Sequence, residues 1–551
     1  MIKQFKTPLI LLLIVVILMF LVNGFSYRLD LTHDQRYSLS TSAIQQLQEI
    51  DAPLRIDVFL TGKLPYSYRQ FKSELDILLR QIQRYKKNVL ISYNDPFELG
   101  DEETVIREMQ QYGMTPDRAF EMQDGNRKES ILFPWMIVNF GQRSERIPLI
   151  ERQLGDTEEQ VIQQGLQQLE YRIFDGIHKV THKNKSNIAV LSSHKTSKSV
   201  TIADLLQSIK PYYNLASFDL KNPTISPQRS LENLLHFQLM IISNPQEHFN
   251  ETEKFILDQY ELSGGRLLWL VDGIGMDRDS LFNTTGTAYG FPLDLQLDDY
   301  FFHRGVRINK QLIKDLYCAP IVLANGTENN TQYIPYPWPY YPLSKPEATT
   351  MGKDLGPVIT QFVSPLDTLA NPLRKTILLK TSAFTKTLGT PVVMQLEEAT
   401  EKIQPAQFNE EEQFMGVLLQ GASSSLFLNK IKPFTGPNIK NQGVIKSAVF
   451  SDGNIAENQT DKGKFLPLGY DKWTNNNYAN KNLLMNVIHD LCNASDRLQL
   501  RSKTWQIVRL DKQKMDENAI FWKWITLFTT LTLGLVSGGA VYLQRSKHLA
   551  A

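Results

Sequence analysis

Three short polar segments near the middle of the chain carry the residue types that could do chemistry. They are Ser192-Ser193-His194, Ser243-Asn244-Pro245 and Asp272-Gly273, and each directly follows an apolar run. A serine, a histidine and an aspartate brought together can form a hydrolytic site, because the imidazole takes the proton of the attacking hydroxyl. Loops after strands are also rich in Ser, Asn, Asp and Gly for turn formation alone. We therefore expect a structural role, with hydrolysis by Ser193, His194 and Asp272 as the alternative.

The short motifs that mark the common enzyme classes are absent from the sequence. It contains no G-x-x-x-x-G-K-[ST], H-E-x-x-H, G-x-S-x-G or C-x-x-C, and no Cys/His cluster with zinc-ligand spacing. Asp298 and Asp299 could bind a cation, although a solvated helix start explains both carboxylates equally simply. We predict no catalytic residue, no cofactor and no metal site.

The polar segments follow apolar runs that alternate with helical patterns. The runs are Ile188–Leu191, Leu239–Ser243 and Leu267–Val271, with helices expected at about 202–209 and 252–262. Continuous apolar strands alternating with helices are typical of a parallel sheet covered on both faces. Because such sheets bind ligands at the carboxyl ends of their strands, the polar segments are expected to meet at that edge. We predict a central, doubly wound α/β domain over residues 187–310.

Two further regions flank the predicted central domain. Residues 28–182 combine strand and helix patterns, including a helix over 66–85 and a hairpin around 141–144, and predict an N-terminal α+β domain. Residues 311–510 show weaker, mixed patterns and are expected to pack on the central domain. We therefore predict an α/β fold class. A chain of this length is expected to divide into domains of roughly 100–200 residues each.

An aromatic and proline-rich run, Tyr333 to Pro342, is the most unusual segment of this mixed region. Because proline lacks the backbone N–H, we expect neither a central strand nor a helix. The run is either a rigid loop packed over the adjacent sheet or a ledge that binds a partner. The candidate partner-binding residues of the ledge are Tyr336, Trp338, Tyr340 and Tyr341.

Both ends of the chain are apolar. A bilayer core about 30 Å thick needs about 20 helical residues, and residues 8–25 and 520–543 both come close to that length. Basic residues lie outside each run, which favours cytoplasmic termini. The expectation is a transmembrane helix at each end, an inner (cytoplasmic) membrane location and a periplasmic bulk of the chain. The first run could instead be a cleaved signal peptide.

The second apolar run contains the pair Gly534 and Gly538 in a G-x-x-x-G pattern. Small residues allow helix backbones to approach closely in lipid, so the pair is a candidate transmembrane packing site, although glycine is also common in membrane helices.

Overall composition excludes a nucleic-acid-binding footprint. The 551 residues include 59 Lys plus Arg and 58 Asp plus Glu. The chain has two cysteines, Cys318 and Cys492, and the sequence alone does not decide whether they form a disulfide.

Several of these segments together resemble the auxiliary proteins of ABC transporters. The combination is similar to the GldG family of gliding-associated auxiliary (substrate-binding-like) proteins from Bacteroidetes. The resemblance covers nearly the whole chain and rests on residues 28–32, 35–40, 58–65, 92–96, 188–193, 264–272, 305–309 and 337–343.

This resemblance implies a non-catalytic accessory subunit of a transporter linked to gliding motility and secretion. Its implied partners are an ABC permease and, through it, a cytoplasmic ATPase, with a periplasmic domain that binds partners or substrate. The central domain also resembles an amidotransferase-like sheet, yet no cysteine stands at Ser243 or Asn244, where that class would place its nucleophile. The alternative function is a membrane-anchored envelope hydrolase or amidotransferase-like enzyme.

Overall fold

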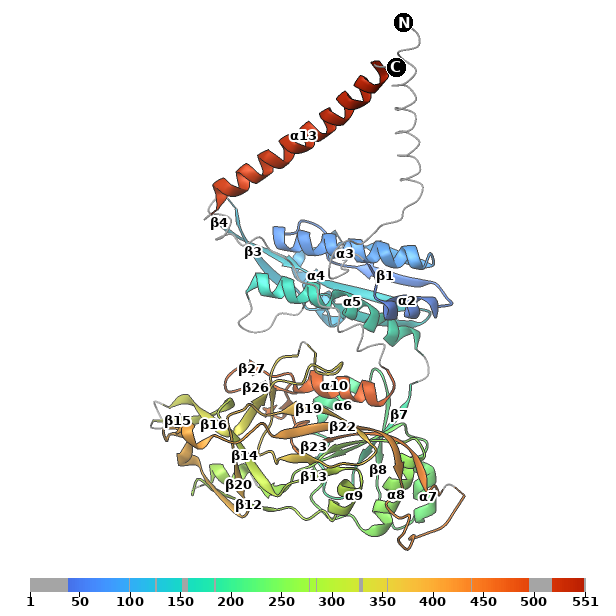
Figure 1. Cartoon of the computed structure of the whole chain (residues 1–551), viewed down its shortest axis with the longest axis vertical. Helices are drawn as coiled ribbons and strands as arrows, with labels where there is room; N and C mark the ends of the chain where they lie inside the picture. Colours follow the sequence, from blue (N-terminus) through green and yellow to red (C-terminus); the bar gives the residue numbers. More distant parts are fainter. Residues whose placement is uncertain are drawn as a thin grey trace. The chain divides into compact units, whose positions relative to one another are not determined.

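The structure is a computed structural model. It describes residues 38–98, 100–123, 126–150, 157–182, 185–276, 278–283, 285–326, 331–353, 355–437, 439–494 and 518–549. Figure 1 shows a mixed α/β chain with several sheets.

The N-terminal region, residues 38–182, is built on a four-stranded sheet of order β2-β1-β5-β6, in which β1 and β2 are parallel and the other pairs antiparallel. Helix α3 coincides with the predicted helix and buries Phe71, Leu75, Leu78, Leu79 and Ile82 at helical spacing. The elements are α2 (Thr41–Gln48), β1 (Leu54–Val58), α3 (Tyr66–Tyr85), β2 (Val89–Tyr93), η1 (Pro96–Glu98), α4 (Glu102–Gln111), β3 (Asp117–Gln123), β4 (Asn126–Leu132), β5 (Trp135–Phe140), β6 (Arg143–Pro148) and α5 (Glu158–Thr181).

The central sheet has nine strands. Five run parallel in the order β8-β7-β9-β10-β23, and β22, β18, β19 and β13 extend the sheet antiparallel beyond β23, so it is mixed rather than purely parallel. The elements are β7 (Asn187–Leu191), α6 (Ala203–Ile209), β8 (Asn214–Phe218), α7 (Pro227–Leu234), β9 (Leu239–Ser243), α8 (Glu251–Leu262), β10 (Arg266–Leu270), α9 (Asp298–His303), β13 (Val306–Ile308), β18 (Leu366–Thr368), β19 (Arg374–Lys380), β22 (Phe414–Ser424), β23 (Gln442–Phe450) and α10 (Asn480–Leu491).

Helices cover both faces of this sheet, which explains its continuous apolar strands. Helices α6 and α10 lie on one face, and α7, α8 and α9 lie on the other (Figure 1). Strand β9 is buried along its full length, so its side chains pack alternately into the two cores. Fully burying one large aliphatic side chain contributes about 1.5–3 kcal/mol.

Smaller sheets are formed by segments between β10 and β22 and by segments after β23. Strand β12 (Thr287–Pro292) pairs with β11 (Ile274–Met276) and β21 (Val392–Gln395), and β16 (Gln332–Ser344) pairs with β15 (Cys318–Asn325) and β17 (Val358–Ile359). Three two-stranded sheets pair β14 (Gln311–Asp315) with β20 (Thr385–Gly389), β24 (Thr460–Asp461) with β25 (Lys464–Phe465), and β26 (Tyr470–Asp471) with β27 (Asn476–Asn477). Short 3-10 turns are η2 (Arg278–Phe282), η3 (Leu396–Ala399) and η4 (Pro405–Gln407).

The aromatic and proline-rich run lies in β16, so the prediction that it forms a rigid loop is wrong. Along Tyr333 to Pro342 the strand pairs on one side only, with β15, because β17 pairs only with Leu343 and Ser344. Pro335, Pro337 and Pro339 are spaced by two residues, so their nitrogens all point to one side of the strand. The N–H groups of the intervening residues point to the opposite side. On that opposite side β15 pairs with Tyr333 to Pro337.

The C-terminal unit, residues 505–551, contains α13 (Ala519–Leu549). In the part of the chain that the structure describes, no helix has the length and apolar character needed to span a membrane. The predicted transmembrane helix at 520–543 and the predicted inner-membrane location with cytoplasmic termini are therefore wrong. Lys523 and the hydroxyls of Thr526, Thr529 and Thr530 interrupt the apolar surface of α13. The other expected span, residues 8–25, lies outside the described residues.

Candidate functional site

The carboxyl edge of the central sheet contains the crevice where a ligand would be expected. The chain leaves β7 toward β8 on one side and returns to β9 on the other, so the order of strands reverses between β7 and β9. Doubly wound sheets bind ligands at such a switch point. The predicted segment Ser192-Ser193-His194 directly follows β7, and Ser243 ends β9 with Asn244 directly after it.

Backbone contacts close this crevice with the chain itself. The Ser197 N–H donates to the Ser243 carbonyl at 2.9 Å, and the Gln246 N–H donates to the His194 carbonyl at 2.8 Å. His194 has a φ of 61°, is 1% exposed and stacks on Phe249 with ring centroids 3.9 Å apart. The loop after β7 is therefore held against β9 and the loop that follows it.

Ser193, His194 and Glu253 form a chain of hydrogen bonds in this loop. His194 Nδ1 lies 2.9 Å from Ser193 Oγ, and His194 Nε2 lies 3.2 Å from Glu253 Oε2. A histidine protonated at Nε2 would donate to the carboxylate and accept the serine proton at Nδ1. The residue order Ser–His–acid is that of a serine hydrolase, but the two ring nitrogens are exchanged relative to that template. Sequence reasoning identified the serine and the histidine but missed Glu253, which lies 59 residues further along the chain.

The same groups also perform structural tasks. Ser193 Oγ accepts the Leu220 N–H at 3.2 Å, which ties the loop after β8 to the loop after β7. Glu253 accepts the Asn250 N–H at 2.8 Å, and Asn250 caps the Glu253 N–H in return, so the pair forms a capping box at the start of α8. Each member of the hydrogen-bond chain therefore fixes a loop or a helix end.

Asp272, the third residue of the expected hydrolytic set, contacts a different segment. Its Oδ1 accepts the Gly453 N–H at 2.6 Å. Asn244 Nδ2 donates to Asn454 Oδ1 at 3.1 Å, so the loop after β23 is held by residues after both β9 and β10. A Cβ at Gly453 would stand 2.5 Å from Asn244 Oδ1, which makes glycine the residue that fits. We call Asn244, Asp272, Gly453 and Asn454 the edge cluster.

Ser243 stands where an amidotransferase-like sheet would carry its nucleophile. Its hydroxyl donates to Ser197 Oγ at 3.3 Å, and Ser197 in turn donates to Glu457 Oε1 at 3.0 Å. Ser243 is 2% exposed. These contacts bind the switch-point loop to the segment after β23.

The four candidate ledge residues divide into two pairs. Trp338 and Tyr340 are buried, and the Tyr340 hydroxyl donates to Glu398 Oε2 at 3.0 Å. Burial and the neighbouring Glu398 raise the pKa of Tyr340 above its usual range. Tyr336 and Tyr341 are half-buried and pack against the same apolar cluster. Partner binding by these residues stays a prediction, for which the half-buried pair offers the accessible surface.

The remaining predicted positions are placed as follows. Gly534 and Gly538 lie on α13, and their role in helix packing stays a prediction without the membrane crossing that it assumed. Cys318 and Cys492 form no disulfide with each other, and burial raises the pKa of Cys318 to about 11.

Asp298 and Asp299 lie in the first turn of α9, beside a shallow groove of about 590 Å³. Asp299 pairs with Lys254 at 3.0 Å and Lys430 at 2.8 Å; although burial opposes the change, these lysines lower its pKa. Among the described residues no group of His, Cys, Asp and Glu could hold a metal ion. We call this hollow the α9 groove; its lining includes Asp298, Asp299, Phe302, Leu426, Leu428 and Lys430.

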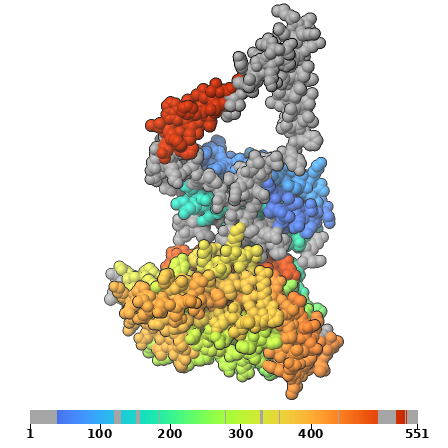
Figure 2. Space-filling view, in the orientation of Figure 1, coloured from blue at the N-terminus to red at the C-terminus, as the bar shows by residue number. Residues whose placement is uncertain are grey.

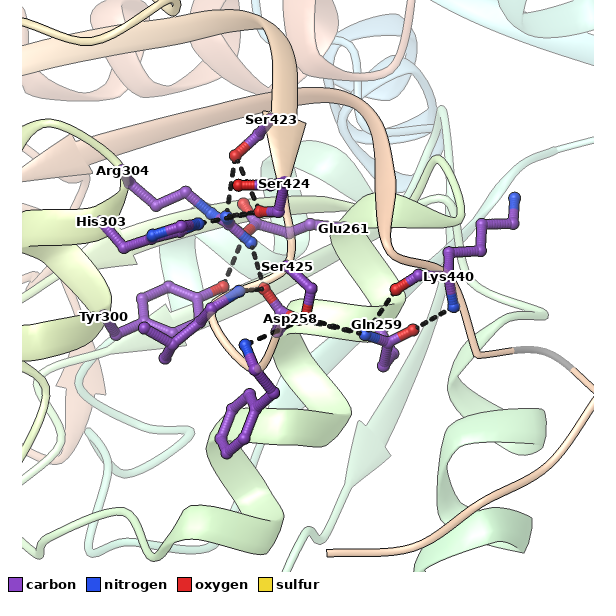
Figure 3. A network of polar contacts seen from close by, with 12 residues as sticks. Asp258, Gln259, Glu261, Tyr300, His303, Arg304, Ser423, Ser424, Ser425 and Lys440 are labelled. Carbon is purple, nitrogen blue, oxygen red and sulfur yellow. Dashed lines mark hydrogen bonds and ion pairs between the residues drawn. The ribbon is translucent and has the colours of Figure 1, made fainter. Parts of the chain in front are cut away.

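A buried charged network, which the sequence did not reveal, lies beneath this groove (Figure 3). Arg304 donates to Asp258 Oδ1 at 2.8 Å and to Glu261 Oε2 at 2.9 Å, and all three side chains are buried. The Tyr300 hydroxyl also donates to Glu261, at 2.5 Å. Burial opposes the charged form of Arg304, but the two carboxylates and Tyr300 raise its pKa above its usual range. The network joins α8 to α9.

Comparison with known proteins identifies the family of this α/β chain. Residues 185–487, more than half of the 551 residues, match the auxiliary-protein family described as an ABC-type uncharacterized transport system. The chain therefore belongs to this family of ABC-transporter auxiliary proteins, and its role is an accessory one in an ABC-type transport system. Residues 33–139 match a domain of unknown function.

Other comparisons add little. No curated protein matches the chain. Among solved structures, one described as "mmIFT52 N-terminal domain" is 15% identical, with 59% of this chain and 100% of that chain covered. Its TM-score of 0.32 is too low to support an argument about the fold.

Proposed function

We propose that the chain is a non-catalytic accessory subunit of a GldG-type ABC transport system linked to gliding motility and secretion. It acts by binding other subunits of that system, a permease and through it an ATPase, rather than by transforming a substrate. The family match supports the accessory role; the gliding link and the two named partners rest on the sequence resemblance.

The observation that supports the non-catalytic part is the hydrogen bonding between the loops at the switch point. The Ser197–Ser243 and Gln246–His194 backbone contacts tie the loop after β7 to β9 and the residues that follow it, at the edge where a doubly wound domain binds its ligand. Asn244, Asp272 and Asn454 also hydrogen-bond within the edge cluster, so these groups fix the loops of the sheet.

Affinity purification of the tagged full-length chain from its source cells tests the proposal. We expect the permease and the ATPase of one ABC system to be enriched together, at a constant ratio across salt washes. Recovery of the chain without either subunit would contradict the proposal. A tagged, unrelated protein expressed at the same level controls for non-specific enrichment.

A second candidate function is ester or amide hydrolysis by Ser193, His194 and Glu253. It is favoured by the 2.9 Å and 3.2 Å contacts that connect the three side chains. Screening the purified chain against chromogenic esters and amides tests it. Turnover that is lost in Ser193→Ala and retained in Ser192→Ala would establish this function, and equal background rates in all three proteins would remove it.

A further inference from the structure

The connection between β22 and β23 is far longer than its geometry requires. These strands are antiparallel neighbours that pair from Gly416–Phe450 to Ser424–Gln442, yet residues 425–441 separate them. Neighbouring antiparallel strands need only about 2–5 connecting residues, and longer loops in compact domains are usually functional or disordered. We call residues 425–441 the β22–β23 loop; it is the orange segment at the lower right of Figures 1 and 2.

Two aromatic residues fasten this loop to the body of the protein. Phe427 and Phe434 are buried, and each packs edge-on against Phe255 of α8 with ring centroids 4.9 Å apart. Such edge-on aromatic pairs add stabilisation beyond the burial of their area. The loop is therefore held at two points along its length.

Buried polar residues of α8 hold the two ends of the loop. Asp258 accepts the Ser425 hydroxyl at 2.6 Å and the Leu426 N–H at 3.0 Å, as Figure 3 shows in part. Gln259 accepts the Lys440 N–H at 2.6 Å and donates to the Lys440 carbonyl at 3.1 Å. Asp258 is itself neutralised by Arg304. These contacts set the conformation of the loop before any partner arrives.

Between its fixed points the loop presents apolar and basic side chains to solvent. Ile431 is 94% exposed and Leu428 is 48% exposed, and Phe302, at 65%, lies across the α9 groove. Residues 425–441 contain three lysines, Lys430, Lys432 and Lys440, and no acidic residue. An ordered loop that exposes a large aliphatic side chain beside uncompensated positive charge is typical of a binding surface.

The acidic residues of the groove do not cancel this charge. Asp299 is paired with Lys254 and Lys430, and Asp298 lies 3.4 Å from Lys310. Lys432 donates to a neutral group, the Asn441 amide oxygen, at 3.0 Å, and Lys440 is exposed. The loop and its groove therefore carry surplus positive charge.

We propose that the β22–β23 loop and the α9 groove bind an acidic, amphipathic segment of a partner protein. The apolar side of the segment contacts Phe302, Leu428 and Ile431, and its carboxylates lie against Lys432 and Lys440. This inference rests on the proposed accessory function and identifies the part of the chain that a transport-system subunit would contact.

Site-specific photocrosslinking in the source cells tests the proposal on the full-length chain. A benzophenone amino acid placed at Ile431 is expected to crosslink a permease or ATPase segment that contains an apolar residue flanked by Asp or Glu. The same probe at Val393, an exposed apolar position of β21, should not crosslink that segment. Crosslinks only to lipid, to a second copy of this chain, or to segments without acidic residues would overturn the proposal.

Affinity measurements with the crosslinked segment as a synthetic peptide provide a second test. Ile431→Glu and Lys432→Glu should each weaken binding at least about tenfold, and binding should weaken further as salt rises because the contact is electrostatic. Val393→Glu is the matched control and should bind as wild type. Unchanged affinity in Ile431→Glu would contradict the inference, and equal melting temperatures would show that the variants remain folded.

The two proposals fail in distinguishable ways. If the permease and ATPase co-purify with Ile431→Glu as well as with wild type, the accessory function stands and the β22–β23 loop is not the docking element. If neither subunit co-purifies with wild type, the proposed function itself fails.

Discussion

His194 and Glu253 lie 59 residues apart in sequence, and their side chains meet at 3.2 Å inside the protein. The contact joins the loop after β7 to the first turn of α8, so it links the two elements that border the switch point of the central sheet. Because Glu253 also completes the capping box of α8, this side chain serves helix formation and loop closure together. Ser193, His194 and Glu253 therefore have the residue order of a hydrolase, and the same side chains hold a structural loop in place.

Replacing Arg304 should destabilise the chain strongly. Arg304→Met leaves Asp258 and Glu261 buried without their counter-charge, and breaking a buried ion pair from one side costs about 3–5 kcal/mol. Arg307→Met, three residues away, removes an exposed ion pair with Asp367 and should cost less than about 1 kcal/mol. Urea denaturation of both variants gives the comparison. Equal losses would show that the network is not the source of stability.

Replacing Trp338 distinguishes packing from partner binding in β16. The indole is fully buried, so Trp338→Ala should lower the free energy of unfolding by about 3–5 kcal/mol. Tyr333→Ala, at a position that is 59% exposed on the same strand, should leave the melting temperature nearly unchanged. A Trp338→Ala chain that melts as wild type but fails in complementation would instead support the partner ledge.

Asp315 should give the stability of the chain a defined pH dependence. Burial raises the pKa of Asp315 in the folded state, although hydrogen bonds from Ser382 and Tyr317 oppose the shift. A raised folded pKa means that the native state binds the proton more tightly, so the contribution is complete below the usual pKa of about 4 and is lost as pH rises through the raised value. Wild type should therefore lose stability relative to Asp315→Asn as pH rises above the usual aspartate pKa of about 4.

Asp101 provides the control of opposite sign. The backbone N–H of Thr104 lowers the pKa of Asp101, so its contribution is present above the usual aspartate pKa and is lost as pH falls through the lowered value. Wild type should gain stability relative to Asp101→Asn as pH rises. The same trend in both variants would contradict the assignment for Asp315.

Local pattern was enough to predict the strands that build the parallel core. The continuous apolar runs that begin at Ile188, Leu239 and Leu267 became β7, β9 and β10, because a strand buried on both faces needs apolar side chains at every position. The helix at 66–85 was also predicted from the sequence, because its apolar residues are spaced so that they lie on one face of a helix.

Other features depend on contacts that no local pattern shows. Strand β23 pairs with β10, although β23 begins only at Gln442 and β10 ends at Leu270. This pairing joins segments that are far apart in the sequence, so no local pattern predicts it. The prolines of β16 suggested a loop because single-residue rules ignore their common spacing. Nothing in the sequence distinguishes Arg304, Asp258 and Glu261 from ordinary surface charges. The packing of α8 and α9 brings the three side chains together in the core. The apolar character of residues 520–543 led to a membrane helix that the structure does not support.

Complementation of a deletion strain by Ser193→Ala tests the central claim, an accessory and non-catalytic role, most directly. The hydroxyl contacts His194 and accepts the Leu220 N–H, so its loss should cost about 1–3 kcal/mol and leave the fold intact. The account predicts full complementation and continued co-purification of the permease and ATPase. Loss of function in a chain that retains its melting temperature and still co-purifies both subunits would contradict it, because a catalytic serine is the group whose removal has that effect.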